Sequence, residues 1–280
     1  MTAQMLKKQP KTQFISGVGA IADQYDAFMI DVWGVVHDGV RLNPGSRDCL
    51  QQMKAMGKKF IFLSNTPFRS TELLENLMEM GLDAQYCESA MTAGEATWRD
   101  LCAYDGQKMF VMGKRYQGLT EGRNIVEDVR QADFILSTLG GSYEGEEDTL
   151  YEAMTKALEL KLPMICANPD LEVQIGSTIA YCAGHYAQWY EERGGEVHWH
   201  GKPYPSVYVE GLKLLGDIDK SRVCAIGDSL RTDMTGAQNF GISGLWNLDG
   251  INTHMTEDQA HILLEQKDLS PVAMMKGFAW

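Results

Sequence analysis

Four short polar segments of this sequence contain the residue types that move a phosphoryl group. Asp31 follows the apolar run FMI, Ser64 follows FIFL, and Lys202 lies in HGKPYP. Asp228 and Asp233 lie in GDSLRTD, which follows VCAI. Phosphoryl transfer to a carboxylate requires a nucleophilic acid, a hydroxyl donor, a cation and acids that hold a metal ion. Each residue taken singly is more typical of a cap, turn or surface position, so the inference rests on their joint occurrence.

The sequence around these residues alternates between strand and helix patterns. Strand patterns cover residues 26–34, 58–65, 222–228 and 243–248, and helix patterns cover residues 43–57, 69–81 and 232–241. This order predicts an α/β fold with a mostly parallel sheet, whose ligands bind beyond the carboxyl ends of the strands. The polar segments stand at such ends, so we expect them to meet in one site.

A second domain is predicted inside the first. The interval between Asn65 and Lys202 is far longer than one helical crossover requires. It has its own strand patterns, KMFVMG, ADFILSTL and LPMICA, and a helix pattern, DTLYEAMTKALELK. We therefore predict a core domain made of residues 1–90 and 196–280, with residues 91–195 inserted as a second α/β domain.

Composition excludes several kinds of partner. The formal net charge of −13 repels nucleic acid and anionic lipid over most of the surface. The N-terminal segment lacks the apolar core of a signal peptide, and no uncharged apolar run reaches the roughly 18 residues of a membrane span. Six scattered cysteines without a CxxC pair favour free thiols. We expect a soluble cytoplasmic protein, with its oligomeric state left open, a homo-oligomer included.

The four segments, in this order, resemble the motifs of the haloacid dehalogenase-like (HAD) hydrolase superfamily. DVWGV is similar to its first motif, LSN to its second, GKP to its third and GDSLRTD to its fourth. The insertion, with ANPD at 167–170, resembles the type II cap of the class IIA subgroup, the sugar phosphatase and p-nitrophenyl phosphatase relatives. The resemblance runs from Tyr25 to Leu248 and implies a Rossmann-like core with an inserted α/β cap.

The resemblance implies a role for each motif residue. Asp31 would attack phosphorus and carry an aspartyl-phosphate, Ser64 would hydrogen-bond a phosphoryl oxygen, and Lys202 would balance charge. The ligands of Mg²⁺, a cation that takes hard oxygen ligands, would be Asp31, Asp228, Asp233 and the backbone carbonyl of Trp33. The residues expected to contact the substrate are Val32, Trp33, Gly34, Asn65 and Asp170. Backbone N–H groups near Gly34 would hold phosphate oxygens.

Trp33 departs from the family pattern. At this position the family's phosphatases have an aspartate, which protonates the leaving oxygen and then activates water. An indole is only a donor and does not titrate, and losing a positioned general acid/base costs roughly 10² to 10⁴-fold in rate. Another group would have to supply the proton transfer, with His37 or Asp170 as candidates, or the substrate would need a good leaving group. Dehalogenation without metal, the third interpretation, is disfavoured by the acids of GDSLRTD.

The predicted function is Mg²⁺-dependent hydrolysis of a small phosphorylated metabolite, a sugar phosphate being one choice. The alternative is a noncatalytic HAD-like protein that binds a phosphometabolite without turning it over. A metal pair at His198 and His200 is disfavoured, because the sequence offers no third ligand nearby.

Overall fold

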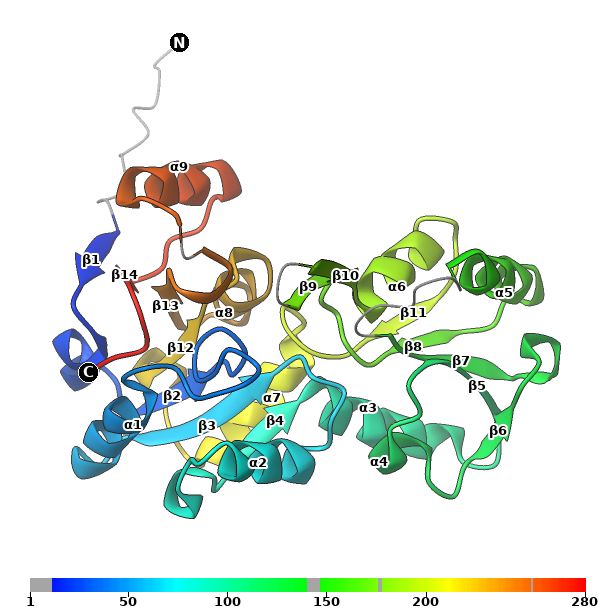
Figure 1. The fold of residues 1–280 in the computed structure, drawn as a ribbon, viewed down its shortest axis with the longest axis horizontal. Helices are drawn as coiled ribbons and strands as arrows, with labels where there is room; N and C mark the ends of the chain where they lie inside the picture. Colours follow the sequence, from blue (N-terminus) through cyan, green and yellow to red (C-terminus); the bar gives the residue numbers. More distant parts are fainter. Residues whose placement is uncertain (1–11, 140–146, 176–177, 253) are drawn as a thin grey trace, which may run out of the picture.

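The computed structural model of the chain describes residues 12–139, 147–175, 178–252 and 254–280. Within these ranges one sheet has seven strands, in the order β1-β14-β13-β12-β2-β3-β4, and each neighbouring pair is parallel (Figure 1). In sheet order the strands are β1 (Gln13–Ile15), β14 (Ala273–Met275), β13 (Ser243–Asn247), β12 (Val223–Gly227), β2 (Ala27–Ile30), β3 (Lys59–Ser64) and β4 (Ala90–Thr92).

The central strand β2 is covered on both faces, which is why its four residues are all apolar and buried. Phe28 and Ile30 pack in the cluster that contains residues of α1 and α2. Ala27 and Met29 face the other way, into the cluster that contains residues of α7 and α8. The helices are α1 (Ser46–Ala55), α2 (Ser70–Glu79), α7 (Pro205–Leu215) and α8 (Thr235–Phe240).

A second sheet of five parallel strands lies beside the first, in the order β11-β8-β7-β5-β6 (Figure 1). One face packs against α5 and α6, and the other against residues of α3 and α4. Its strands are β5 (Lys108–Gly113), β6 (Asn124–Val126), β7 (Phe134–Thr138), β8 (Met164–Cys166) and β11 (Val197–Trp199). Its helices are α3 (Ala93–Leu101), α4 (Gln117–Thr120), α5 (Glu147–Leu160) and α6 (Ala183–Glu191).

The remaining elements are short or peripheral. An antiparallel hairpin joins β9 (Glu172–Ile175) to β10 (Thr178–Tyr181), and α9 (Glu257–Lys267) begins with a capping box formed by Thr256 and Gln259. Single 3₁₀ turns cover residues 18–20, 22–24, 84–86, 102–104, 129–131, 220–222 and 250–252. None of the helices in the described part of the chain is both long and apolar enough to cross a membrane.

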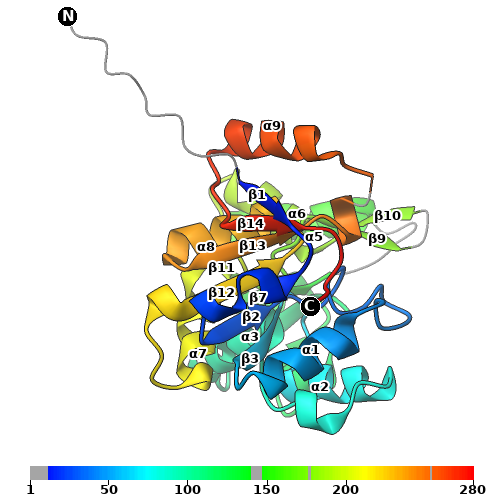
Figure 2. The ribbon, with the colours of Figure 1, turned by 90° about the vertical axis from the view of Figure 1, so that its left-hand side faces the viewer.

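This arrangement confirms the predicted α/β fold, in which a second α/β unit is inserted into the core. The domain limits at 90/91 and 195/196 remain a proposal. Near the first limit, β4 belongs to the first sheet, and near the second limit, β11 belongs to the second sheet. Figure 2 shows a pairing that the sequence did not predict: β1, near the start of the chain, lies against β14 at its end. Such a pairing depends on contacts between distant segments, for which a local pattern gives no signal.

Candidate active site

The candidate site lies where the adjacent strands β12, β2 and β3 end. Asp31 directly follows β2, and its backbone N–H donates to Ile226 O of β12 at 2.8 Å. Asp228 directly follows β12, and Asp233 lies in the π-helical turn Leu230–Met234 that comes next. The structure brings one carboxylate oxygen from each of these three aspartates within 4.8 Å of one another, and all three residues are buried. The predicted meeting of the acids is therefore observed.

Lys202 lies between two of these acids. Its Nζ donates to Asp31 Oδ1 at 2.5 Å and to Asp233 Oδ1 at 2.7 Å, and the lysine is only 3% exposed. Burial alone would lower the pKa of Lys202, but the carboxylates of Asp233 and Asp31 raise it above its usual range. Lys202 is therefore a permanent cation at the centre of the cluster.

Several opposing effects act on the pKa of the Asp31 carboxyl. Burial raises the pKa of its carboxyl to about 7, although the charge of Lys202 lowers it. The charge of Asp233 also raises the pKa, hydrogen bonds from Lys202 and from the backbone N–H of Val32 lower it, and the value of about 7 is the net result of all these effects. The carboxyl thus lies in a poorly solvated position, where an ionised group is an effective nucleophile once a substrate and a cation are present.

The donor set of the cluster fits a hard divalent cation. Three buried carboxylates face one lysine, so the cluster has an excess of negative charge that favours a cation with oxygen ligands. Two glycines leave room for the carboxylate of Asp228: a Cβ at Gly34 would lie 2.2 Å from its Oδ2, and a Cβ at Gly250 would lie 2.0 Å from it. Among the described residues this is the one group of acids, histidines and cysteines close enough to hold a metal ion.

Asn65 connects three parts of the site. Its Oδ1 accepts from the backbone N–H of Lys202 at 2.6 Å, and its Nδ2 donates to Lys202 O at 3.1 Å. The same Nδ2 donates to Asp170 Oδ1 of the second domain at 2.9 Å. The neighbouring Ser64 is buried, and its Oγ accepts from the N–H of Thr66 at 3.3 Å. Asn65 of the LSN segment therefore contacts Lys202, and Ser64 precedes it at the end of β3.

Trp33 and His37 belong to one turn over the site. The Trp33 side chain is 45% exposed, and its ring meets that of His37 edge to face at 5.5 Å. His37 is buried, which lowers its pKa, and its Nδ1 accepts from the N–H of Gly39 at 2.9 Å. Gly34, at φ +83°, donates its N–H to His37 O at 2.8 Å. The Gly34 N–H is thus held by the turn, so phosphate binding by this group stays a prediction and would require that bond to open.

The histidines of the HWH segment are not members of this group of acids, and they share an acid of their own. Asp100, at the end of α3, has its Oδ2 at 2.9 Å from His200 Nε2 and at 3.4 Å from His198 Nδ1. The sequence could not indicate this acid, because it is about a hundred residues away. Among the described residues, Asp100 and the two histidines do not form a group close enough to hold a metal ion. Their contacts instead join the two connections between the domains.

Three side chains that support the site were missed by the sequence reasoning. Trp246 Nε1 donates to Asp228 O at 2.9 Å, and Asn252 Nδ2 donates to the same oxygen at 2.5 Å. Asn247 Nδ2 donates to Gly34 O at 3.5 Å. They orient the backbone on both sides of the Asp228 carboxylate. Their types carry no catalytic signal, and only the folded chain places them there.

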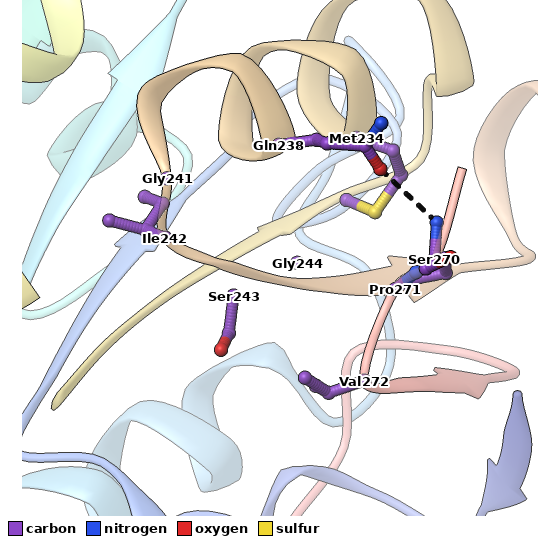
Figure 3. A pocket seen from close by; sticks show the side chains of 9 residues that line it. All are labelled: Met234, Gln238, Gly241, Ile242, Ser243, Gly244, Ser270, Pro271 and Val272. Atoms are coloured by element: carbon purple, nitrogen blue, oxygen red, sulfur yellow. Dashed lines mark hydrogen bonds between the residues drawn. The ribbon is translucent and has the colours of Figure 1, made fainter. Parts of the chain in front are cut away.

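A hollow at the other end of the sheet is not a candidate site. It is lined by Met234, Gln238, Gly241, Ile242, Ser243, Gly244, Ser270, Pro271 and Val272 (Figure 3). The lining has no titratable side chain, and the N–H of Ser270 donates to Gln238 Oε1 at 3.3 Å across it (Figure 3). The hollow includes the first residues of β13, whereas the acids follow the last residues of β2 and β12.

Comparison with known proteins agrees with this geometry. A family model described as haloacid dehalogenase-like hydrolase matches residues 28–134, and a HAD-hydrolase-like model matches residues 199–268. An acid sugar phosphatase from Staphylococcus aureus (strain USA300) is 24% identical over 238 residues, which cover 82% of this chain and 89% of that protein.

Two solved structures resemble the whole fold. A haloacid dehalogenase-like hydrolase from Brucella suis 1330 has a TM-score of 0.81 and 28% identity, covering 93% of this chain and 98% of that one. A p-nitrophenyl phosphatase from Archaeoglobus fulgidus has a TM-score of 0.72 and 25% identity, covering 91% and 97%. These matches confirm the resemblance that the four motifs carry, and the core and cap that it implied.

Proposed function

Because the chain belongs to the haloacid dehalogenase-like hydrolases, we propose that it is a Mg²⁺-dependent phosphatase that forms an aspartyl-phosphate on Asp31. The proposed substrate is a small phosphorylated metabolite, with sugar phosphates as the first class to test, because an acid sugar phosphatase is among the similar proteins. The observation that carries the proposal is Lys202, buried between Asp31 and Asp233 in a cluster of three acids. A nucleophile, its counter-ion and acids for a metal occur together there.

Each residue of the site has its own proposed role in phosphoryl transfer. Asp31 attacks phosphorus, and Lys202 offsets the negative charge that gathers between nucleophile and phosphate. Ser64 donates its hydroxyl hydrogen to a phosphoryl oxygen. The residues that would hold Mg²⁺ are Asp31, Asp228, Asp233 and, by its carbonyl, Trp33. When bound, the ion supplies positive charge that favours phosphate binding and phosphoryl transfer.

The contacts proposed for the substrate surround this cluster. Val32 directs its N–H to the carboxylate of Asp31, Asn65 holds the Lys202 loop, and Asp170 reaches the site from the cap. The ring of Trp33 is exposed beside the nucleophile and offers an apolar surface to the part of the substrate that does not react. The cap side of the site therefore selects the substrate, while the core side carries the reaction.

The direct test is a screen of phosphorylated metabolites with purified protein, with Mg²⁺ and with a chelator in its place. We expect phosphate release from at least one sugar phosphate or related ester, and loss of that release with the chelator. Release that is unaffected by chelation would contradict the metal dependence. Binding of phosphorylated ligands without any release, by folded protein with Mg²⁺, would favour the noncatalytic binding protein.

The metal assignment makes a separate prediction. Asp228→Asn removes one ligand charge, so we expect the affinity for Mg²⁺ to fall by about 10²-fold or more, because Mg²⁺ prefers charged oxygen ligands. Isothermal titration calorimetry measures the affinity directly. Asp217→Asn is the matched control, since Asp217 is exposed and lies outside the cluster. Equal affinities in Asp228→Asn and the wild type would rule out Asp228 as a ligand.

A further inference from the structure

The proposed phosphatase lacks an acid at Trp33, so another group must protonate the leaving oxygen of an ordinary ester. His37 is a poor choice, because its Nδ1 already accepts from Gly39 and burial lowers its pKa. The remaining candidate of the described structure that approaches the cluster from the cap is Asp170, which follows β8 in the loop 167–170.

The hydrogen bond that holds the Asp170 carboxyl is made by Oδ1. Its Oδ1 accepts from Asn65 Nδ2 at 2.9 Å, and the Arg231 guanidinium lies 3.6 Å from the same oxygen. Arg231 also donates to Pro169 O at 2.7 Å, which fixes the loop to the core. Within the described residues the other oxygen, Oδ2, takes part in no hydrogen bond, and the side chain is 37% exposed. The loop thus anchors one side of the carboxyl and leaves the other available to a ligand.

The hydrogen bonds also determine where a proton on Asp170 would lie. The backbone N–H of Lys202 can only donate, so it fixes Asn65 Oδ1 toward Lys202 and Asn65 Nδ2 toward Asp170. Because Asp170 Oδ1 accepts from this amide and faces a guanidinium, the proton of the acid form is placed on Oδ2. The free oxygen is therefore the one that can donate.

The surroundings of Asp170 raise the pKa of its carboxyl above the usual range. Burial raises the pKa of Asp170, while the hydrogen bond from Asn65 and the charges of Lys202 and Arg231 lower it. The charge of Asp233 raises it, and the net direction is upward. Asn65 links Asp170 to the catalytic cluster, because it hydrogen-bonds both Asp170 and the backbone of Lys202. Carboxyls raised in this way serve as general acids.

We propose that Asp170 is the general acid and base of this enzyme, acting from the cap through Oδ2 in place of the carboxylate absent at Trp33. The role rests on the proposed phosphatase function. In the first step a bond forms between an Asp31 oxygen and phosphorus, the bond from phosphorus to the ester oxygen breaks, and Asp170 gives its proton to that oxygen. In the second step Asp170 takes a proton from the water that attacks phosphorus, and phosphate leaves as Asp31 regains its carboxylate.

The test compares two esters in Asp170→Asn under single-turnover conditions, with enzyme in excess. Nitrophenyl phosphate has a leaving group that needs no proton, whereas glycerol phosphate has an alkoxide that does. We expect nitrophenolate release to stay within about 10-fold of the wild-type rate, and glycerol release to fall by roughly 10² to 10⁴-fold. Retained nitrophenolate release also shows that the variant is folded and that its nucleophile works.

Glu172→Gln is the matched control, since Glu172 is an exposed acid two residues further along the cap, and both of its rates should equal those of the wild type. Equal losses for both esters in Asp170→Asn would make Asp170 a positioning residue and overturn the proposal. Unchanged glycerol release would overturn it as well. A wild type that releases no nitrophenolate at all would instead overturn the phosphatase function on which the proposal rests.

Discussion

Replacing Asp31 by asparagine is expected to reduce turnover by a factor on the order of 10⁶, to the uncatalysed background, while the protein stays folded. The amide is similar in size but is a poor nucleophile, so no aspartyl-phosphate can form. Lys202 keeps its second partner, Asp233, at 2.7 Å. Burial raises the pKa of the Asp31 carboxyl, so folding disfavours its ionised form and a neutral amide should not destabilise the metal-free protein.

Phosphate release and thermal unfolding, measured on the same preparation, test this expectation. Asp249 provides the control, because it stands in the loop after β13 and belongs to none of the proposed roles. Asp249→Asn should retain wild-type turnover. Residual turnover in Asp31→Asn well above background would remove Asp31 from the mechanism, whereas loss of the folded state would mean that the carboxylate is needed for structure.

Replacing Lys202 by methionine should damage both turnover and stability. The change leaves the buried acids of the cluster without their cation, and removing one partner of a buried ion pair costs about 3 to 5 kcal/mol of unfolding free energy. Turnover should fall by roughly 10³-fold, because the charge that offsets the approach of Asp31 to phosphate is lost. Mg²⁺ should recover part of the stability, since it supplies positive charge to the same acids.

Denaturant titrations with and without Mg²⁺ measure this effect. Lys213→Met is the matched control, because Lys213 is on α7 close in sequence but its side chain is 66% exposed. That variant should unfold like the wild type, since exposed ion pairs contribute little. If Lys202→Met were as stable as the wild type without metal, the three acids would not be ionised together in the folded protein, and the charge balance described for the site would be wrong.

The elements with strong local patterns were predictable from the sequence. The run from Ala27 to Ile30 is buried on both faces, and α1 and α2 end near the glycines at positions 57 and 81, as their patterns indicate. The parallel direction of the strands followed from the alternation of elements, because parallel neighbours require crossovers. The polar strand ends then had to share one edge of the sheet, which is why Asp31 and Asp228 meet.

What the sequence could not predict depends on contacts between distant segments. Asn65 was expected near the substrate, but its bonds to Lys202 and Asp170 across the two domains could be found only in the folded chain. The acid shared by His198 and His200 is Asp100, on another connection between the domains. Hydrogen bonds between such distant residues leave no periodic pattern in the sequence, so the sequence alone does not predict which residues will pair.

The covalent state of Asp31 during turnover is the most direct test of the central claim. The protein is mixed with nitrophenyl phosphate and Mg²⁺, quenched in acid within the first turnover, digested, and analysed by mass spectrometry. Slowing the second step by Asp170→Asn should increase the amount trapped. The account predicts a phosphoryl group bound to the Asp31 side chain in a peptide that contains DVWGV. Nitrophenolate release with that peptide unmodified at every time point would contradict it.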